Sequence, residues 1–129
     1  MELVQARLVT DDVAALAAFY ARLLDTQVTL NGYYVEVPAG PASVGFSHRR
    51  FTEYPPGRAA RPACPHRREE FILDFEASDV DAEHGRITAL GVDWLLPPTD
   101  QPWGNRTMTF RDPAGTLVNV FSRGQAGTG

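Results

Sequence analysis

The order of hydrophobic and polar positions along the chain predicts a strand, a helix and three strands, and then the same order again. In the first copy, residues 4–10 alternate in the manner of a strand, which places Gln5, Arg7 and Val9 on one face. An apolar series with helical spacing follows over residues 13–24. Turn signals then separate three short predicted strands at residues 28–30, 33–37 and 42–47.

The second copy follows the same pattern from residue 70 onward. Alternation over residues 71–76 places Ile72, Asp74 and Glu76 on one face of a strand. A helix is predicted from about residue 80 to Leu90, with Gly91 as its C-cap. The remaining predicted strands are 92–96, 106–111 and 117–122, and the turn Asp112-Pro113-Ala114-Gly115 joins the last two.

Short polar side chains mark the start of each predicted helix. Asp11 or Asp12 is expected to cap the first helix, and Ser78 or Asp79 the second, because an oxygen on such a side chain accepts an unpaired N–H of the first turn. The two helices are therefore fixed at their N-termini by local chemistry.

An internal repeat of about sixty residues, each copy a strand, a helix and three strands, predicts an α+β fold of two βαβββ modules. Each helix covers one face of its own sheet, so the other faces are expected to lie together or against a partner chain and to form a curved mixed sheet around a cleft. The predicted organisation is module one at 3–48, a Pro/Arg-rich linker at 49–68, module two at 69–123 and a frayed tail at 124–129.

Composition narrows the class of protein. A chain of 129 residues is long enough for one domain with its own core, and the single cysteine, Cys64, excludes an intramolecular disulfide framework. The N-terminus has no apolar leader and the chain has no apolar run of membrane-spanning length, so we expect a cytoplasmic protein without a membrane partner.

Charge is unevenly distributed around the net value of −4. All twelve basic residues are arginine, and half of them lie between residues 48 and 68, beside a single acid, Glu53. Such a stretch could bind phosphate or nucleic acid, or it could be a solvated linker lying on an acidic protein. The second reading is favoured, and no nucleic-acid partner is expected, because no nucleic-acid-binding motif accompanies the arginines.

Two segments carry a family resemblance: LVTDDVAALAAFYARLL, and PWGNRTMTFRDPAGTLVNVF with its Trp-Gly step and Asp-Pro-x-Gly hairpin. Together they resemble the vicinal-oxygen-chelate superfamily, which includes glyoxalase I, extradiol dioxygenases, fosfomycin-modifying enzymes and the bleomycin-resistance proteins. The resemblance extends from Leu3 to Ser122 and implies two βαβββ modules around a U-shaped cleft, usually in a homodimer.

Metal enzymes of that superfamily hold His or Gln, His and two Glu on the first and last strands of the modules. Gln5 and Ile72 lie seven residues before Asp12 and Asp79, and Asn119 lies seven residues after Asp112, which places them at three of these positions. The fourth falls at Gly45, with Ser43, Ser47 or His48 as the other possible occupants. Neutral amides, an isoleucine and a glycine are poor ligands for a divalent cation, so neither a metal nor another cofactor is predicted.

The amide of Asn119 is left with two readings, a structural hydrogen-bonding group or a ligand contact. Arg7 and Asp74 occupy equivalent places in the two modules, so they are expected either to pair or to reach solvent. Trp103, between Pro102 and Gly104, either contacts a ligand at the cleft lip or packs beneath its loop. The predicted ligand-binding residues are Gln5, Arg7, Tyr34, Ile72, Asp74, Glu76, Trp103, Asn119 and Phe121.

The scaffold without its metal ligands resembles the bleomycin-resistance branch most. It predicts a metal-independent, homodimeric protein that sequesters or carries a planar, polar natural product or antibiotic in an aromatic-lined cleft. Asp74, Glu76 and the net negative charge suit a cationic ligand. The alternative is a glyoxalase-like lyase or isomerase, or a dioxygenase-type enzyme, with shifted metal ligands or a carboxylate base such as Asp74 or Glu76.

Overall fold

The computed structural model describes residues 2–52 and 71–123 and divides the chain into two compact units, residues 1–64 and 65–129. The described residues of the first unit are called module one below, and those of the second module two. The division falls inside the predicted linker. Most of that linker, with Tyr54, Cys64 and His66, and the predicted tail at 124–129 lie outside the described residues.

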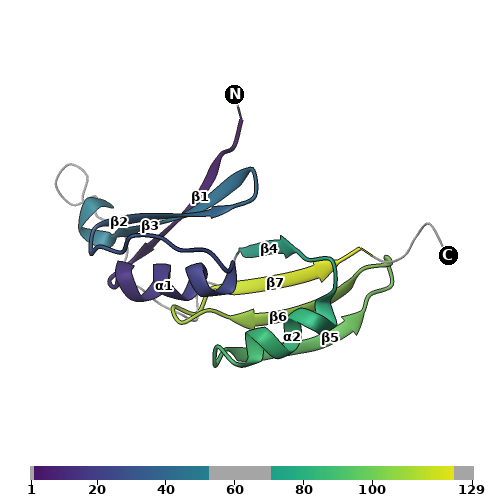
Figure 1. Ribbon diagram of the computed structural model, residues 1–129. Coiled ribbons are helices and arrows are strands. Elements are labelled where there is room, and N and C mark those ends of the chain that lie inside the picture. Colours follow the sequence, from purple (N-terminus) through teal and green to yellow (C-terminus); the bar gives the residue numbers. More distant parts are fainter. Residues whose placement is uncertain (1, 53–70, 124–129) are drawn as a thin grey trace. The chain divides into compact units, whose positions relative to one another are not determined.

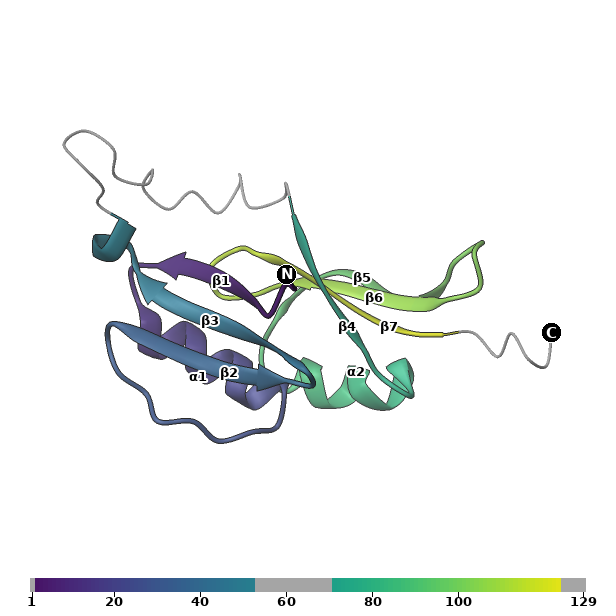
Figure 2. The ribbon, with the colours of Figure 1, turned by 90° about the horizontal axis from the view of Figure 1, so that it is seen from above.

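Module one is a three-stranded sheet with one helix against it (Figure 1). Strand β3 lies in the middle, parallel to β1 on one side and antiparallel to β2 on the other (Figure 2). The elements are β1 (Gln5–Thr10), α1 (Val13–Leu23), β2 (Tyr34–Ala39), β3 (Ala42–His48) and the short 3-10 helix η1 (Arg49–Thr52).

The strand predicted at residues 28–30 does not form, and an irregular segment takes its place. Asp25, with φ of 52°, turns the chain sharply after α1. Farther on, the side chain of Asn31 accepts the backbone N–H groups of Tyr33 and Tyr34, each at 2.9 Å. This Asx turn occupies the backbone donors where pairing would start, so the next strand begins only at Tyr34.

Helix α1 follows the sequence prediction closely. Asp12 is its N-cap, and the carboxylate accepts the N–H of Ala15 at 3.1 Å. The apolar face of the helix packs on the sheet, where the buried ring of Tyr20 lies 5.1 Å from that of Phe46 on β3. That contact defines the face of the sheet that the helix covers.

Module two has four strands in the order β4-β7-β6-β5, with β4 parallel to β7 and the other pairs antiparallel. Its elements are β4 (Ile72–Glu76), α2 (Val80–Thr88), β5 (Asp93–Asp100), β6 (Arg106–Arg111) and β7 (Leu117–Ser122). Strand β5 is longer than predicted and includes Pro97 and Pro98, which an edge strand with register shifts tolerates.

Helix α2 buries little apolar surface, because only Val80 and Ile87 are buried. Polar contacts add to its attachment. The guanidinium of Arg106 on β6 forms a bidentate ion pair with Asp81 on α2, with hydrogen bonds of 2.8 and 3.0 Å. It also donates to the carboxylate of Asp100 at 3.1 Å. The hydrogen bond from Arg106 lowers the pKa of Asp81, and the bonds to both carboxylates raise the pKa of Arg106.

Asp79 is the N-cap of α2 and accepts the N–H of Ala82. The helix ends at Thr88 with Ala89 as its C-cap, two residues before the predicted C-cap Gly91. None of the described helices combines the length and apolar character needed to cross a membrane.

The β6–β7 turn is built around Asp112, as the sequence predicts. Its buried carboxylate accepts the N–H groups of Ala114 and Thr116, both at 2.8 Å. Gly115 has φ of 88°, which the turn requires and which glycine adopts without strain. The turn thereby sets the register of β6 against β7.

Replacing Asp112 by Ala is expected to lower the free energy of unfolding by about 1–3 kcal/mol, because two backbone N–H groups lose their acceptor. Urea unfolding followed by circular dichroism measures the change. Asp112→Asn is the control, since it keeps one acceptor oxygen and should cost clearly less. Equal costs for Ala and Asn would contradict this role of the carboxylate.

Candidate functional site

The strand registers of the two modules are equivalent. In module one, Arg7 on β1 pairs with Gly45 on β3, and in module two Asp74 on β4 pairs with Asn119 on β7. Gly45 and Asn119 therefore occupy the same position of the repeat. Both lie on the face of the sheet turned away from the module's own helix, which we call the distal face.

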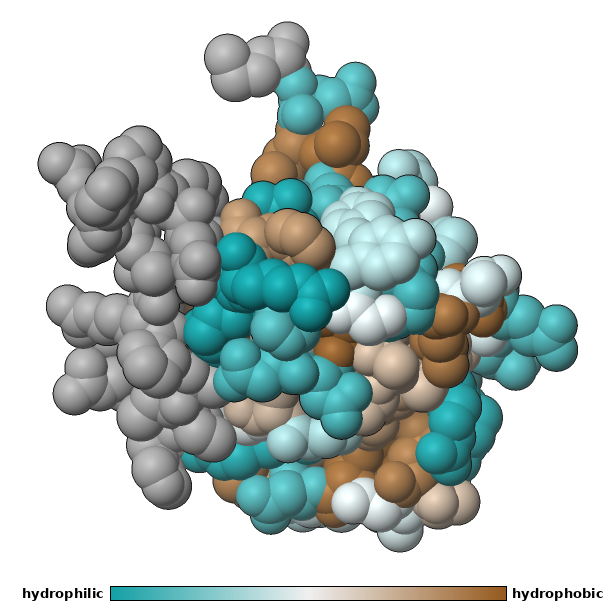
Figure 3. Space-filling model, turned by 90° about the vertical axis from the view of Figure 1, so that its left-hand side faces the viewer, coloured by the Kyte–Doolittle hydropathy of each residue, from teal (hydrophilic) through white to brown (hydrophobic). Residues whose placement is uncertain are grey.

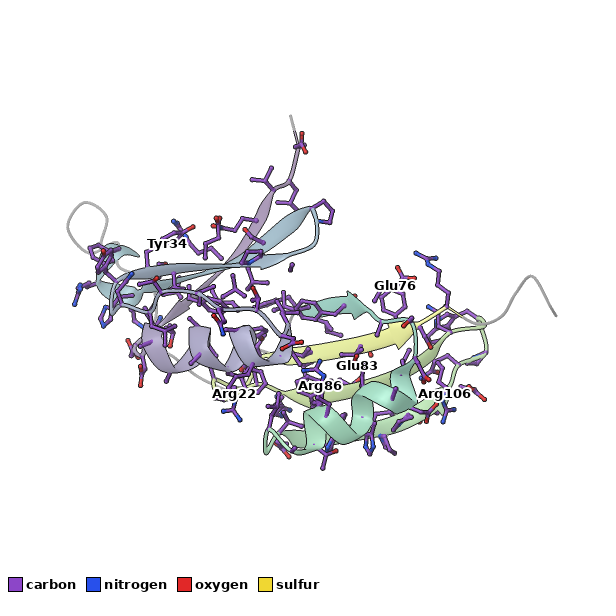
Figure 4. All side chains as sticks on the ribbon, in the orientation of Figure 1. Arg22, Tyr34, Glu76, Glu83, Arg86 and Arg106 are labelled. Carbon is purple, nitrogen blue, oxygen red and sulfur yellow. The ribbon has the colours of Figure 1, made fainter. Side chains whose placement is uncertain are left out.

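A polar cluster occupies the distal face of module one. We call it the module-one cluster, and it consists of Gln5, Tyr34, Glu36 and Ser43. The amide nitrogen Nε2 of Gln5 donates to the Tyr34 hydroxyl at 2.8 Å and to the carboxylate oxygen Oε2 of Glu36. The Ser43 hydroxyl donates to the same Glu36 oxygen at 3.0 Å and lies 3.2 Å from Gln5 Nε2. Figure 4 shows Tyr34 on the side of the sheet away from α1.

Two features fix the Gln5 side chain. Its nitrogen faces Glu36 because the reverse orientation would set the amide oxygen against a carboxylate. Its amide group also lies over Gly45, where an added Cβ would come within 2.7 Å of the Gln5 Cδ and Oε1 atoms. The glycine thus provides the space in which the amide lies.

In module two, Asn119 uses both ends of its side-chain amide. Nδ2 donates to Asp74 Oδ1 at 2.9 Å, and Oδ1 accepts the hydroxyl of Thr109 on β6 at 2.9 Å. The three side chains form a row across β4, β7 and β6. Asn119 is therefore a hydrogen-bonded amide that orients the Asp74 carboxylate, and its contact with a ligand stays a prediction.

Three other predicted residues lie near this row. Ile72 is 50% exposed on β4, and its side chain has no polar atom. Glu76 accepts a hydrogen bond from Arg123 at 2.9 Å, on the side of the sheet away from α2 (Figure 4). Phe121 pairs with Glu76 across the strands, and the Arg123 guanidinium lies 5.9 Å from the centre of its ring.

The predicted ion pair between Arg7 and Asp74 joins the two modules and stays a prediction. Arg7 is exposed, and within the described residues it makes no ion pair. Within module two, the described hydrogen bond of Asp74 comes from Asn119.

The aromatic residues divide into different environments. Trp103 is 70% exposed in the turn between β5 and β6, so it does not pack beneath its loop. Trp94 lies on the helix-covered face, with its ring 4.7 Å from that of His84 and 5.3 Å from that of Phe110. In the face shown in Figure 3, apolar side chains are interspersed with polar ones.

Sequence reasoning did not single out Glu36 or Thr109, and it considered Ser43 only as a substitute for Gly45. Glu36 could have been found, because it follows Tyr34 by two residues and must share its face of the strand. Ser43 and Thr109 join their clusters through cross-strand pairing, which one strand's pattern does not reveal.

Comparison with known proteins gives the family. Residues 2–120 match the Glyoxalase/Bleomycin resistance protein/Dioxygenase superfamily. The chain belongs to this superfamily. No match was found among curated proteins.

Solved structures of similar fold span nearly the whole chain. A glyoxalase/bleomycin resistance protein/dioxygenase from Nocardioides has a TM-score of 0.79 at 20% identity, over 97% of this chain and 85% of that one. A protein of unknown function from Agrobacterium tumefaciens has a TM-score of 0.75 at 25% identity, over 95% and 94%. A lactoylglutathione lyase from the same species has a TM-score of 0.71 at 23% identity, over 94% and 92%. These likenesses confirm the predicted α+β fold of two βαβββ-type modules.

The residues at the family's metal-ligand positions do not fit a divalent cation. The side chains of Gly45 and Ile72 offer no ligand atom, both ends of the Asn119 amide make hydrogen bonds, and Gln5 supplies a single neutral amide oxygen. Within residues 2–52 and 71–123, no three His, Cys, Asp or Glu side chains are grouped as metal ligands. Hard cations require several charged or carbonyl oxygens, which this set does not provide.

Replacing Gly45 by Ala is expected to displace Gln5, because the new Cβ would overlap the end of its side chain and not the backbone. The side-chain amide NMR signals of Gln5 should shift, while the free energy of unfolding changes by no more than about 1 kcal/mol, since the hydrogen bonds lost are exposed or only partly buried. Gly32→Ala is the matched control, because a Cβ there meets no atom within 4 Å. Unchanged Gln5 signals in Gly45→Ala would show that the amide does not lie over the glycine.

Proposed function

We propose that the protein binds a small, planar and polar molecule, of the natural-product or antibiotic type, without a metal ion. One observation carries the proposal: in each module, a neutral amide at one of the family's metal-ligand positions is hydrogen-bonded to a carboxylate. Gln5 donates to Glu36 in module one, and Asn119 donates to Asp74 in module two. Such pairs present fixed donors and acceptors, which suits recognition of a polar ligand.

The surroundings of these pairs support a ligand with an aromatic or planar body. Tyr34 is 37% exposed beside Gln5, and Phe121 is half-buried opposite Glu76. Aromatic rings provide large flat contacts, and the neighbouring polar atoms fix the ligand's orientation.

Binding is expected to persist in protein freed of metal by a chelator. We would titrate the chelator-treated, isotopically labelled chain with planar aromatic compounds bearing amide, hydroxyl or amine groups and follow the side-chain amides of Gln5 and Asn119 by NMR. Metal analysis of the same sample serves as the control. Binding that disappears with the chelator and returns with Zn, Ni, Mn or Fe would refute metal-independent recognition.

A second candidate function, an enzyme using a carboxylate base, rests on Asp74. Asn119 holds Oδ1 of this exposed carboxylate at 2.9 Å, and no described residue donates a hydrogen bond to Oδ2. A carboxylate held in this way can accept a proton from an acidic carbon of a bound molecule and return one to it.

If Asp74 is such a base, the protein exchanges a carbon-bound proton of its ligand with deuterium from solvent, and Asp74→Asn slows that exchange at least about 100-fold. NMR or mass spectrometry of the recovered ligand measures the exchange. Asp93→Asn, which removes an exposed carboxylate from the same sheet, is the matched control. Equal exchange in the wild type and in Asp74→Asn would exclude Asp74 as the base.

A further inference from the structure

The side chains that donate hydrogen bonds to the Glu36 carboxylate are neutral. Its oxygen Oε2 accepts from the Gln5 amide and from the Ser43 hydroxyl, and neither donor carries a positive charge. No Arg or His in the described part of the chain forms an ion pair with Glu36. The module-one cluster therefore keeps a net negative charge on the distal face.

Arg7 is the nearest basic residue by register, and it does not neutralise that charge. Arg7 and Glu36 pair with Gly45 from opposite sides, so their backbones are two strand spacings apart, about 9–10 Å. The amide of Gln5 lies over the glycine between them. The salt bridge that such a row could form is absent from the described residues.

Two oxygen atoms of the module-one cluster accept no hydrogen bond from the described residues. Both described donors to Glu36 go to Oε2, and no described group donates to Oε1. The Gln5 nitrogen makes all the described contacts of its amide, which leaves the Gln5 oxygen Oε1 as a second acceptor. Tyr34 accepts from Gln5, so its own hydroxyl hydrogen can point elsewhere.

We propose that Glu36 and Gln5 form a subsite for the protonated amine of an aromatic ligand, with the ring of Tyr34 against the aromatic part. This inference rests on the proposed function and names the chemical class of the ligand. Two neighbouring acceptor oxygens, one of them charged, match an ammonium group with its three N–H donors. Charge-assisted hydrogen bonds of this kind are stronger than neutral ones.

An ammonium group fits the cluster better than a divalent cation does. A bare cation must exchange its water for several oxygen ligands, and Glu36 is the only carboxylate in the cluster. Glu36 also lies across from Gly45, the position at which the family resemblance places a metal-binding glutamate. Module one thus has a carboxylate next to Gly45, on β2 and not on β3, and Gln5 donates a hydrogen bond to it.

The test uses three compounds with one indole ring: tryptamine, tryptophol and indole-3-propionate. Each is titrated into the full-length labelled chain, and backbone and Gln5 side-chain amide shifts give the location and the Kd. Tryptamine is expected to bind about tenfold more tightly than tryptophol and to shift amides of β2 and β3, because only the amine makes a charge-assisted bond to Glu36.

Glu36→Gln is expected to weaken the binding of tryptamine about tenfold and that of tryptophol clearly less. Asp25→Asn is the matched control: it removes the same charge from module one, and asparagine tolerates the positive φ of 52° at that position. Both compounds should bind this control as they bind the wild type. Preserved folding of each variant is checked by its amide spectrum.

Equal binding of tryptamine and tryptophol at β2 and β3 would overturn the amine subsite and leave the proposed function standing. A tryptamine preference that survives Glu36→Gln, or shifts confined to β4 and β7, would overturn it as well. If none of the three indoles shifts any amide, the subsite is refuted, and the wider panel of planar compounds then decides the proposed function. Stoichiometric shifts of the same amides by MgCl2 or ZnCl2, lost in Glu36→Gln, would replace the ammonium by a metal ion.

Discussion

The arrangement of both modules depends on one-sided burial of their sheets. In a strand, successive side chains point to opposite faces, so the packing of one face under a helix fixes the residues of the other. In module one, the contact of Tyr20 with Phe46 commits β3, and with it the neighbouring strands, to a single register. A slip of β3 by one residue would expose Phe46, and a slip of β2 by one residue would bury Glu36. The first slip loses hydrophobic burial, and the second buries a charge. The positions of Gln5 and Glu36 on the distal face follow from this core.

One-sided burial applies to both modules, and each of them pairs an amide with a carboxylate, although the two side chains come from different strands. In module one the amide comes from β1 and the carboxylate from β2, with a glycine between them on β3. In module two the amide comes from β7 and the carboxylate from β4, which are directly paired. The register is shared, whereas the residues that fill it are not. Each module therefore presents a carboxylate that a neutral amide orients.

Local chemistry explains which parts of the fold could be predicted from the sequence. The helix caps Asp12 and Asp79 and the turn at Asp112 act through hydrogen bonds within four residues, so the sequence pattern contains all of their partners. The segment at 28–30 was misjudged because its β-forming residues compete with the Asn31 turn that follows. The partners of Gln5 lie 29, 31 and 38 residues away, so the composition of its cluster depends on strand order and register. Alternation within β2 could have placed Glu36 on the same face as Tyr34, whereas Ser43 required the pairing of β1 and β2 with β3.

A carboxylate that is hydrogen-bonded to a neutral amide keeps its negative charge available to a ligand, whereas a carboxylate paired with a cation does not. A lysine or arginine would cancel the charge, and the face would then offer little to a polar molecule. The amide of Gln5 satisfies one oxygen of Glu36 and restricts the motion of the carboxylate, but the negative charge remains. Because the negative charge of Glu36 is not cancelled, a ligand with a positive charge gains a charge-assisted hydrogen bond that a neutral ligand of the same shape does not. Under the proposed function, a sheet face whose carboxylate is held by a neutral amide is therefore suited to recognising a polar or cationic molecule directly.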